Sequence, residues 1–158
     1  MDKDKPMAAV ITMNPSLSDN IITDTTTTLV VNNIARLGEF GGVIIVNLYS
    51  LLTSKLDFRW NADEELNFPE NDTYIKKAAD ESDVVILAWG KGAANNQRIA
   101  DRVEHVLSIL EPYKSKLWTI TDGEREMTHP LFPAVRSSWN LKSFIYKQPA
   151  DETSADSK

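Results

Sequence analysis

Two asparagines and one histidine are the residues of this chain best suited to chemistry. Asn14 and Asn47 each stand where the chain leaves a short apolar run, and His129 precedes a proline shortly after another such run. An amide side chain both donates and accepts hydrogen bonds, and an imidazole carries a proton that titrates near neutral pH. The aromatic residues Tyr49 and Trp89 lie close to two of the run ends. The set indicates recognition of a planar polar ring rather than chelation of a metal.

Each of these residues also has a plain structural explanation, and the sequence alone leaves both readings open. Asn14 precedes Pro15, a common turn pair, because asparagine bonds its own backbone and tolerates unusual backbone angles. The amide of Asn47 could satisfy its hydrogen bonds within the core. His129 fits a turn, and Trp89 fits a hydrophobic core as well as a stacking surface.

The composition excludes several kinds of site. The chain has 158 residues, a formal charge of −6, two histidines and no cysteine. The lack of cysteine excludes a disulfide framework, a thiol nucleophile and cysteine-bound zinc or iron–sulfur sites. The sequence contains no phosphate-binding loop, dinucleotide-binding turn or nucleophile-elbow motif, so we expect no metal and no cofactor. The acidic balance also argues against a broad surface that grips phosphates.

Four apolar runs rich in β-branched residues are expected to form the strands that position these side chains. The runs are nearly continuous rather than alternating, which is typical of strands buried on both faces of a parallel sheet. They cover residues 8–13, 43–48, 84–89 and 117–121.

Three segments with helical spacing lie between these runs. One begins at Asp24 or Thr25 and ends at Gly38, a second covers residues 72–81, and a third covers residues 96–110. The alternation predicts a three-layer α/β/α sandwich around a four-stranded, mostly parallel sheet. Ligands bind beyond the carboxyl ends of the strands in such sheets, so we expect the strand-end residues to converge on one edge.

The remaining segments complete the expected organisation. Residues 1–148 are expected to form a single domain, and residues 149–158 have the composition of a disordered acidic tail. The connection at residues 51–70 lacks a clear period and contains three aromatic residues, which is typical of a functional loop or lid. The start of the chain has no apolar core of a signal peptide and no run approaches membrane-spanning length, so we expect a cytoplasmic location.

Short motifs follow one another in a specific order from about Lys5 to about Phe144. In that order they resemble domain-of-unknown-function family 1643, an uncharacterised set of bacterial and phage proteins. The family has no established activity, so this resemblance implies none. The motifs are Lys5-Pro6, Ala9-Val10-Ile11-Thr12-Met13-Asn14-Pro15-Ser16, Asp24-Thr25-Thr26, Gly42, Val46-Asn47-Leu48-Tyr49, Pro69-Glu70-Asn71-Asp72, Ala88-Trp89-Gly90, Thr121-Asp122-Gly123 and His129-Pro130-Leu131-Phe132.

Four of these motifs follow predicted strands, at Asn14-Pro15, Asn47, Trp89-Gly90 and His129-Pro130. In this order they are distantly similar to the uracil-DNA glycosylase superfamily. The similarity implies a three-layer fold in which Asn14 positions an attacking water, as in the mismatch-specific branch. It further implies that Asn47 reads the edge of a flipped base and that His129 stabilises charge on the departing base.

The residues and the similarity together indicate a domain that binds a nucleobase, nucleoside or nucleotide and, in its enzymatic version, hydrolyses an N-glycosidic bond. Asn14 and His129 are the candidate catalytic residues. The expected partner is a nucleobase-containing ligand or a single-stranded or flipped nucleic acid, rather than duplex DNA, given the negative charge. The candidate ligand-binding residues are Pro15, Ser16, Asp24, Asn47, Tyr49, Trp89 and Gly90.

Two other functions stay open. Glycosylases usually have glycine two residues before the water-positioning residue, where this chain has Thr12. With the altered His-Pro loop and the acidic charge, this favours a non-catalytic module that senses or sequesters a nucleotide, encoded by a phage or mobile element. The aromatic segment at residues 58–68 favours instead a protein-interaction domain that docks a partner there.

Overall fold

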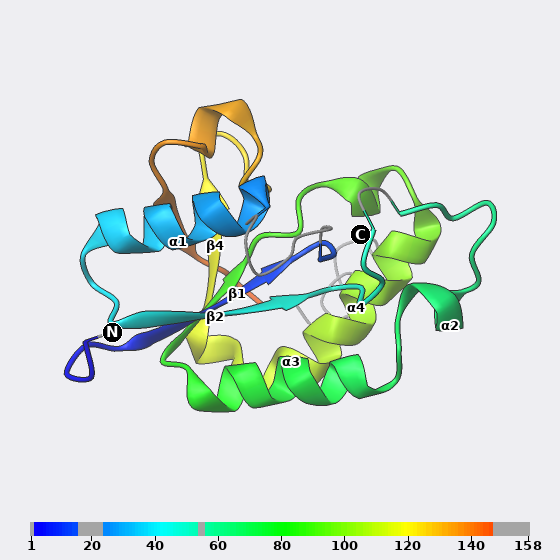
Figure 1. Cartoon of the computed structure of the whole chain (residues 1–158), viewed down its shortest axis with the longest axis horizontal. Helices are drawn as coiled ribbons and strands as arrows, with labels where there is room; N and C mark the ends of the chain where they lie inside the picture. Colours follow the sequence, from blue (N-terminus) through cyan, green and yellow to red (C-terminus); the bar gives the residue numbers. More distant parts are fainter. Residues whose placement is uncertain (1, 16–23, 54–55, 147–158) are drawn as a thin grey trace, which may run out of the picture.

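The computed structural model describes residues 2–15, 24–53 and 56–146. They form a mixed α/β fold with helices on both faces of a five-stranded sheet (Figure 1). The strand order is β2-β1-β3-β4-β5, in which the first four strands are parallel and β5 is antiparallel to β4. The strands are β1 (Met7–Thr12), β2 (Gly42–Asn47), β3 (Val84–Leu87), β4 (Leu117–Thr121) and β5 (Asn140–Ser143).

The sheet has one strand more than the sequence predicts. Strands β1 to β4 fall on the four apolar runs, whereas β5 has the sequence Asn-Leu-Lys-Ser. Three of its four residues are exposed, so β5 carries no apolar run that could reveal it. It pairs with β4 through backbone hydrogen bonds, which the pattern of side chains in the sequence does not reveal.

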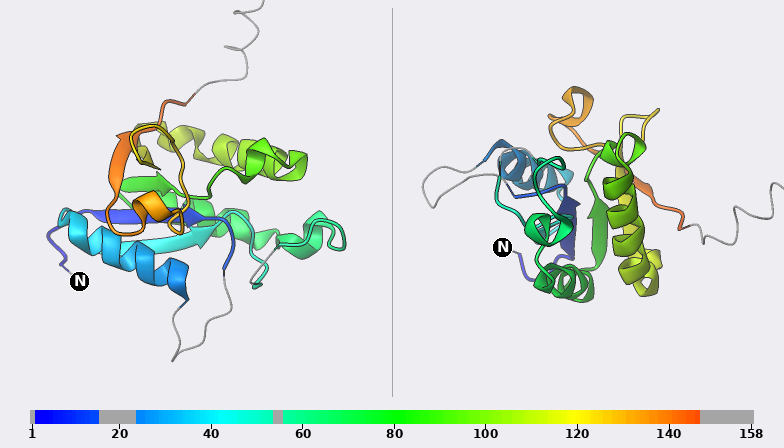
Figure 2. Two further views of the ribbon diagram at one scale, coloured as in Figure 1. Left: turned by 90° about the horizontal axis from the view of Figure 1, so that it is seen from above. Right: turned by 90° about the vertical axis from the view of Figure 1, so that its right-hand side faces the viewer.

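Helices cover both faces of the sheet and divide the core in two. The helix α1 packs on one face over a cluster that includes Val10, Ile86 and Ile120. On the other face α3 and α4 pack over a cluster that includes Ile11 and Leu87. The right-hand view of Figure 2 shows α1 on one side of the strands and α4 on the other. The helices are α1 (Thr25–Leu37), α2 (Asp63–Leu66), α3 (Glu70–Glu81) and α4 (Gln97–Leu110), with short 3₁₀ helices at Gly92–Ala94, Glu111–Lys116 and Pro133–Val135.

The helix ends follow from the sequence. Asp24 is the N-cap of α1, because its carboxylate accepts from the backbone N–H of Thr27, and Gly38 closes the helix in the left-handed region with φ 71°. Asn96 caps α4 in the same way as Asp24. These boundaries confirm the helices predicted at residues 24–38 and 96–110, and the predicted helix at 72–81 begins two residues earlier, at Glu70. The connection at residues 51–70 contains the short helix α2.

The carboxyl ends of β1, β2, β3 and β4 lie at one edge of the sheet because the four strands are parallel. The residues that follow them are therefore brought into one region. Among the described residues, no helix combines the length and apolar character needed to cross a membrane. The tail expected at residues 149–158 lies outside the described residues.

Candidate functional site

A cavity of about 260 Å³ opens where β1 and β2 end beside the first turn of α1. Four of the predicted site residues line it: Asn14, Pro15, Asp24 and Asn47. The parallel register of β1 and β2 makes Thr12 the partner of Asn47, so the residues just beyond both strands face one space. The rest of the described lining comes from Thr12, Thr26, Thr27, Ile45 and Leu52.

Thr12 fixes the amide of Asn47. The hydroxyl of Thr12 donates to Asn47 Oδ1 across 2.5 Å, and Thr12 itself is only 2% exposed. Because Oδ1 is occupied in this way, the Nδ2 group of Asn47 is the part of the amide that remains for a ligand. None of the described residues bonds to it. Asn47 therefore offers a hydrogen-bond donor at the cavity.

Asn14 offers the opposite polarity. Its Nδ2 group donates to the carbonyl oxygens of Thr53, at 2.8 Å, and of Pro15, at 3.2 Å. These two bonds use both N–H groups of the amide. Asn14 Oδ1 is then the group that remains, and an amide oxygen accepts hydrogen bonds from water or from a ligand N–H.

Asp24 adds a carboxylate to the cavity wall. One of its oxygens accepts from the backbone N–H of Thr27 at 3.0 Å and the other from the Thr27 hydroxyl at 2.6 Å. The cap that starts α1 is thus also a wall of the cavity. An amide donor, an amide acceptor and a carboxylate acceptor meet in one space, and they suit a ligand that has both N–H and C=O groups on its rim.

Two helix residues hold the end of β2, and neither was singled out as a site residue from the sequence. Asn71 on α3 donates to the carbonyl oxygen of Asn47 at 2.9 Å and to Asn67 Oδ1 at 2.8 Å. Arg102 on α4 donates through Nε to the carbonyl oxygen of Leu48 at 2.8 Å. The only signal in the sequence was the Asn71-Asp72 pair within the family motif at residues 69–72.

Asp72 anchors that arginine. Arg102 Nη2 lies 2.7 Å from Asp72 Oδ1, and His105 Nε2 lies 2.8 Å from Asp72 Oδ2. Partial burial on its own would raise the pKa of Asp72, but the hydrogen bonds and charges of Arg102 and His105 outweigh it and lower the pKa below 3.8. His105, on α4 like Arg102, is therefore part of the support for β2.

His129 lies at the end of β3, against Gly90. Gly90 has φ 82°, and a Cβ placed on it would lie 3.2 Å from His129 Cβ. His129 Nδ1 accepts from the backbone N–H of Leu131 at 3.1 Å, which leaves Nε2 to carry the proton of the neutral ring. Burial lowers the pKa of His129 below 6.5 and so favours this neutral form. His129 does not line the cavity of Asn14 and Asn47.

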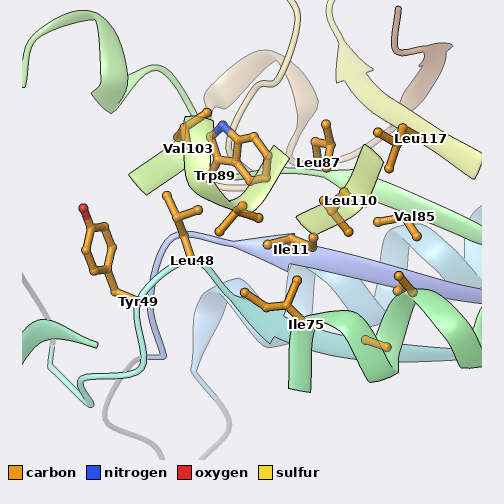
Figure 3. Close-up of a cluster of buried hydrophobic side chains, with 14 of the residues drawn as sticks. Ile11, Leu48, Tyr49, Ile75, Val85, Leu87, Trp89, Val103, Leu110 and Leu117 are labelled. Atoms are coloured by element: carbon orange, nitrogen blue, oxygen red, sulfur yellow. The ribbon is translucent and has the colours of Figure 1, made fainter. Parts of the chain in front are cut away.

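The two aromatic candidates are inside the protein. Trp89 is 1% exposed and lies in the core between Ile11, Leu48 and Val103 (Figure 3). Tyr49 is 2% exposed, and its ring meets the edge of Phe58 with the ring centres 5.7 Å apart.

Neither ring lines the cavity of Asn14 and Asn47. Burial raises the pKa of Tyr49 to about 12, so its hydroxyl stays protonated. Ser16, the remaining candidate, lies outside the described residues.

Arg98 holds the middle of the connection at residues 51–70. Its guanidinium donates to Asp63 Oδ1, to the carbonyl oxygen of Phe58 at 2.7 Å and to that of Asn61 at 3.0 Å. Trp60, in contrast, is 84% exposed. In the part of the chain that the structure describes, no three His, Asp or Glu side chains are grouped so that they could hold a metal ion.

Comparison with known proteins gives one finding. The sequence model of a family described as "Protein of unknown function (DUF1643)" matches residues 1–131. These residues include Asn14, Asp24, Asn47 and His129. No curated protein and no solved structure matches the chain.

Proposed function

We propose that this chain, which belongs to the family of proteins of unknown function DUF1643, binds a nucleobase-containing ligand in the cavity of Asn14, Asp24 and Asn47. The observation that carries the proposal is the opposed polarity of the two amides. Asn47 presents Nδ2 because Thr12 occupies its Oδ1, and Asn14 presents Oδ1 because two carbonyl oxygens occupy its Nδ2. Nucleobases carry donors and acceptors side by side on a planar rim, which matches this arrangement.

The size and lining of the cavity support the same class of ligand. Its volume of about 260 Å³ is slightly below the roughly 300 Å³ at which pockets for drug-sized ligands begin. Pro15, Ile45 and Leu52 add apolar surface to the polar groups, as a flat ring with a polar rim requires. A single base with its sugar directed outward fits these dimensions.

Hydrolysis of an N-glycosidic bond is the second candidate function, and Asn14 favours it. An Asn14 Oδ1 that accepts from water would hold the water but cannot remove its proton, so it would act by positioning. The water oxygen would bond to the anomeric carbon while the bond to the base breaks and the base leaves with the electron pair. The proton that the bonded water then loses would pass to the departed base, so the products are the free sugar hydroxyl and the neutral base. His129 does not line this cavity, so the donor to the departing base would be Asn47 Nδ2. The resemblance of the strand-end motifs in the sequence to the uracil-DNA glycosylase superfamily favours this version.

Binding is tested with a panel of free nucleobases, nucleosides and nucleotides, measured by isothermal titration calorimetry. We expect at least one member to bind and Asn47→Ala to weaken it by about tenfold or more, the loss typical of one hydrogen bond in a partly buried site. The matched control is Asn32→Ala, which removes the same amide from an exposed position on α1. Equal affinity of the Asn47→Ala and Asn32→Ala proteins, or no binding to any member, contradicts the proposal.

Hydrolysis is tested on the same panel, extended to oligonucleotides with modified bases, by chromatographic detection of free base. Asn14→Ala should abolish release but should weaken the binding of free base only by the roughly tenfold expected from one lost hydrogen bond. Binding without release from any substrate leaves the non-catalytic, nucleotide-sensing module as the function.

A further inference from the structure

Resting on the proposed function, we infer that the cavity selects a free nucleobase or nucleoside and rejects the corresponding nucleotide and any nucleic-acid strand. Two observations support it: the charge of the residues that line the cavity, and the contacts that the arginine side chains make elsewhere in the protein.

The described lining of the cavity contains one carboxylate, Asp24, and no lysine, arginine or histidine. Residues 16–23, which join Pro15 to Asp24 in the sequence, contain Asp19 and no basic residue. Other hollows of the protein differ in this respect. The adjoining hollow between β2 and α3 shares Pro15, Ile45 and Asn47 with this cavity and includes Lys77 together with Glu81. The hollow between α4 and β5 includes Lys142.

The first turn of α1 is the natural place for an anion at this site, and Asp24 already occupies it. A helix N-terminus attracts phosphate because its backbone N–H groups point outward without partners. In α1, the Thr27 N–H donates to the Asp24 carboxylate. A phosphate brought to this turn would compete with that carboxylate and be repelled by its charge, a repulsion that partial burial strengthens.

The arginines that could hold a phosphate nearby are committed to the protein itself. Their side chains make ion pairs or donate to backbone carbonyl oxygens, and these contacts hold loops and helices together. Arg36 binds Ser137, Arg102 binds Asp72 and Leu48, Arg125 binds Asp122, and Arg136 binds Leu131. Arg98 binds Asp63, Phe58 and Asn61. Arg59 belongs to a separate hollow, beside Trp60 and Asn96.

A neutral ligand is not repelled by the Asp24 carboxylate and needs no basic side chain to balance its charge. The N–H groups of a base, or the hydroxyls of a ribose, can donate to Asp24 and to Asn14 Oδ1, while Asn47 Nδ2 donates to a ring carbonyl or ring nitrogen. The cavity is thus complementary to an unphosphorylated ligand that supplies more donors than acceptors.

The test compares matched series by calorimetry: uracil, uridine and uridine 5′-monophosphate, with the corresponding adenine, guanine and cytosine series. For the series that binds, we expect the base or nucleoside to bind about tenfold or more tightly than its monophosphate, the scale of one like-charge repulsion near a protein surface. Asp24→Asn should narrow that ratio about fivefold or more, because asparagine caps a helix as well as aspartate but carries no charge.

The control is Glu39→Gln, which removes one negative charge beyond the other end of α1 and should leave the ratio unchanged. Lys55 follows Thr53 closely in the sequence, so Lys55→Ala is included and should also leave it unchanged. The inference is overturned if the monophosphate binds as tightly as the nucleoside and that binding depends on Asn47 or on Lys55. If no member of any series binds, the proposed function fails and this inference fails with it.

Discussion

Thr12 and Asn47 are joined across the ends of β1 and β2 by a hydrogen bond of 2.5 Å from the threonine hydroxyl to the asparagine Oδ1. The pair gives Thr12, two residues before Asn14, a definite structural role. A glycine would leave room near the backbone, whereas a threonine fixes the orientation of the amide beside it. A buried hydroxyl therefore determines that Asn47 presents its Nδ2 group at the cavity.

Thr12→Val should destabilise the protein by about 1–3 kcal/mol, because it leaves Asn47 Oδ1 without its partner in a partly buried position while the volume stays the same. It should also weaken ligand binding, since the Asn47 amide is then free to rotate. Urea unfolding and calorimetry measure the two effects. Thr73→Val, at an exposed position on α3, is the control, and an equal loss of stability in both variants would contradict the role of Thr12.

Gly90→Ala should destabilise the protein by more than Gly38→Ala. Both glycines have positive φ, at 82° and 71°, where alanine costs about 1–2 kcal/mol. Only at Gly90 does the added Cβ meet another side chain, 3.2 Å from His129 Cβ, whereas Gly38 has nothing within 4 Å. The difference between the two unfolding free energies isolates the contact with His129. If the two losses are equal, His129 does not lie firmly against the end of β3.

The His129 ring should titrate below its ordinary pKa of 6.5, because burial disfavours the charged form. The unfolded chain then binds more protons than the folded one, so stability should fall as the pH drops from about 6.5 towards the lowered pKa of the folded state. NMR titration of the imidazole resonances measures the pKa of His129. Only one other histidine, His105, contributes imidazole signals. The ¹⁵N shifts should report a proton on Nε2. A pKa above 6.5, or a proton on Nδ1, would rule out the neutral donor described for His129.

Asp72 should make stability depend on acid. Its pKa is lowered from 3.8 in the folded protein, so the stabilisation is present above about pH 4 and is lost as the pH falls through the lower folded value. Asp72→Asn should remove this part of the acid sensitivity and release Arg102 from its ion pair. Unfolding by urea from about pH 3 to about pH 7 measures it. The control is Asp101→Asn, which removes a carboxylate that accepts from Gln97 on α4 and should leave the dependence of stability on acid unchanged. If stability varies with pH in the same way in both variants, the role given to Asp72 is contradicted.

The first four strands, the main helices and part of the cavity lining follow from simple sequence rules. Continuous apolar runs located β1 to β4, and the rule that parallel strands carry ligands at their carboxyl ends brought Asn14 and Asn47 together. The sequence marks Asp24 as a helix cap and as part of a family motif, and Asp24 lines the same cavity in the structure. These rules succeed because they depend on local patterns and on strand direction alone.

The supporting residues could not be found in the same way. Asn71 binds the carbonyl oxygen of Asn47, 24 positions earlier in the chain, and Arg102 binds that of Leu48, 54 positions earlier. No local sequence pattern encodes contacts over such separations. The position of His129 depends on a loop that folds back against Gly90, and that of Trp89 on how the core closes around it. Backbone acceptors leave no trace in a sequence, so this level of organisation appears only in the folded chain.

The most direct measurement of ligand binding at this cavity is an NMR titration that follows the side-chain amide resonances of the asparagines as a nucleoside is added. The Nδ2 resonances of Asn47 and Asn14 should shift with a common saturation curve, while those of the exposed Asn32 and Asn140 should not move. Shifts confined to the hollow between α4 and β5, or no shift at Asn47 at saturating nucleoside, would contradict a ligand site at the ends of β1 and β2.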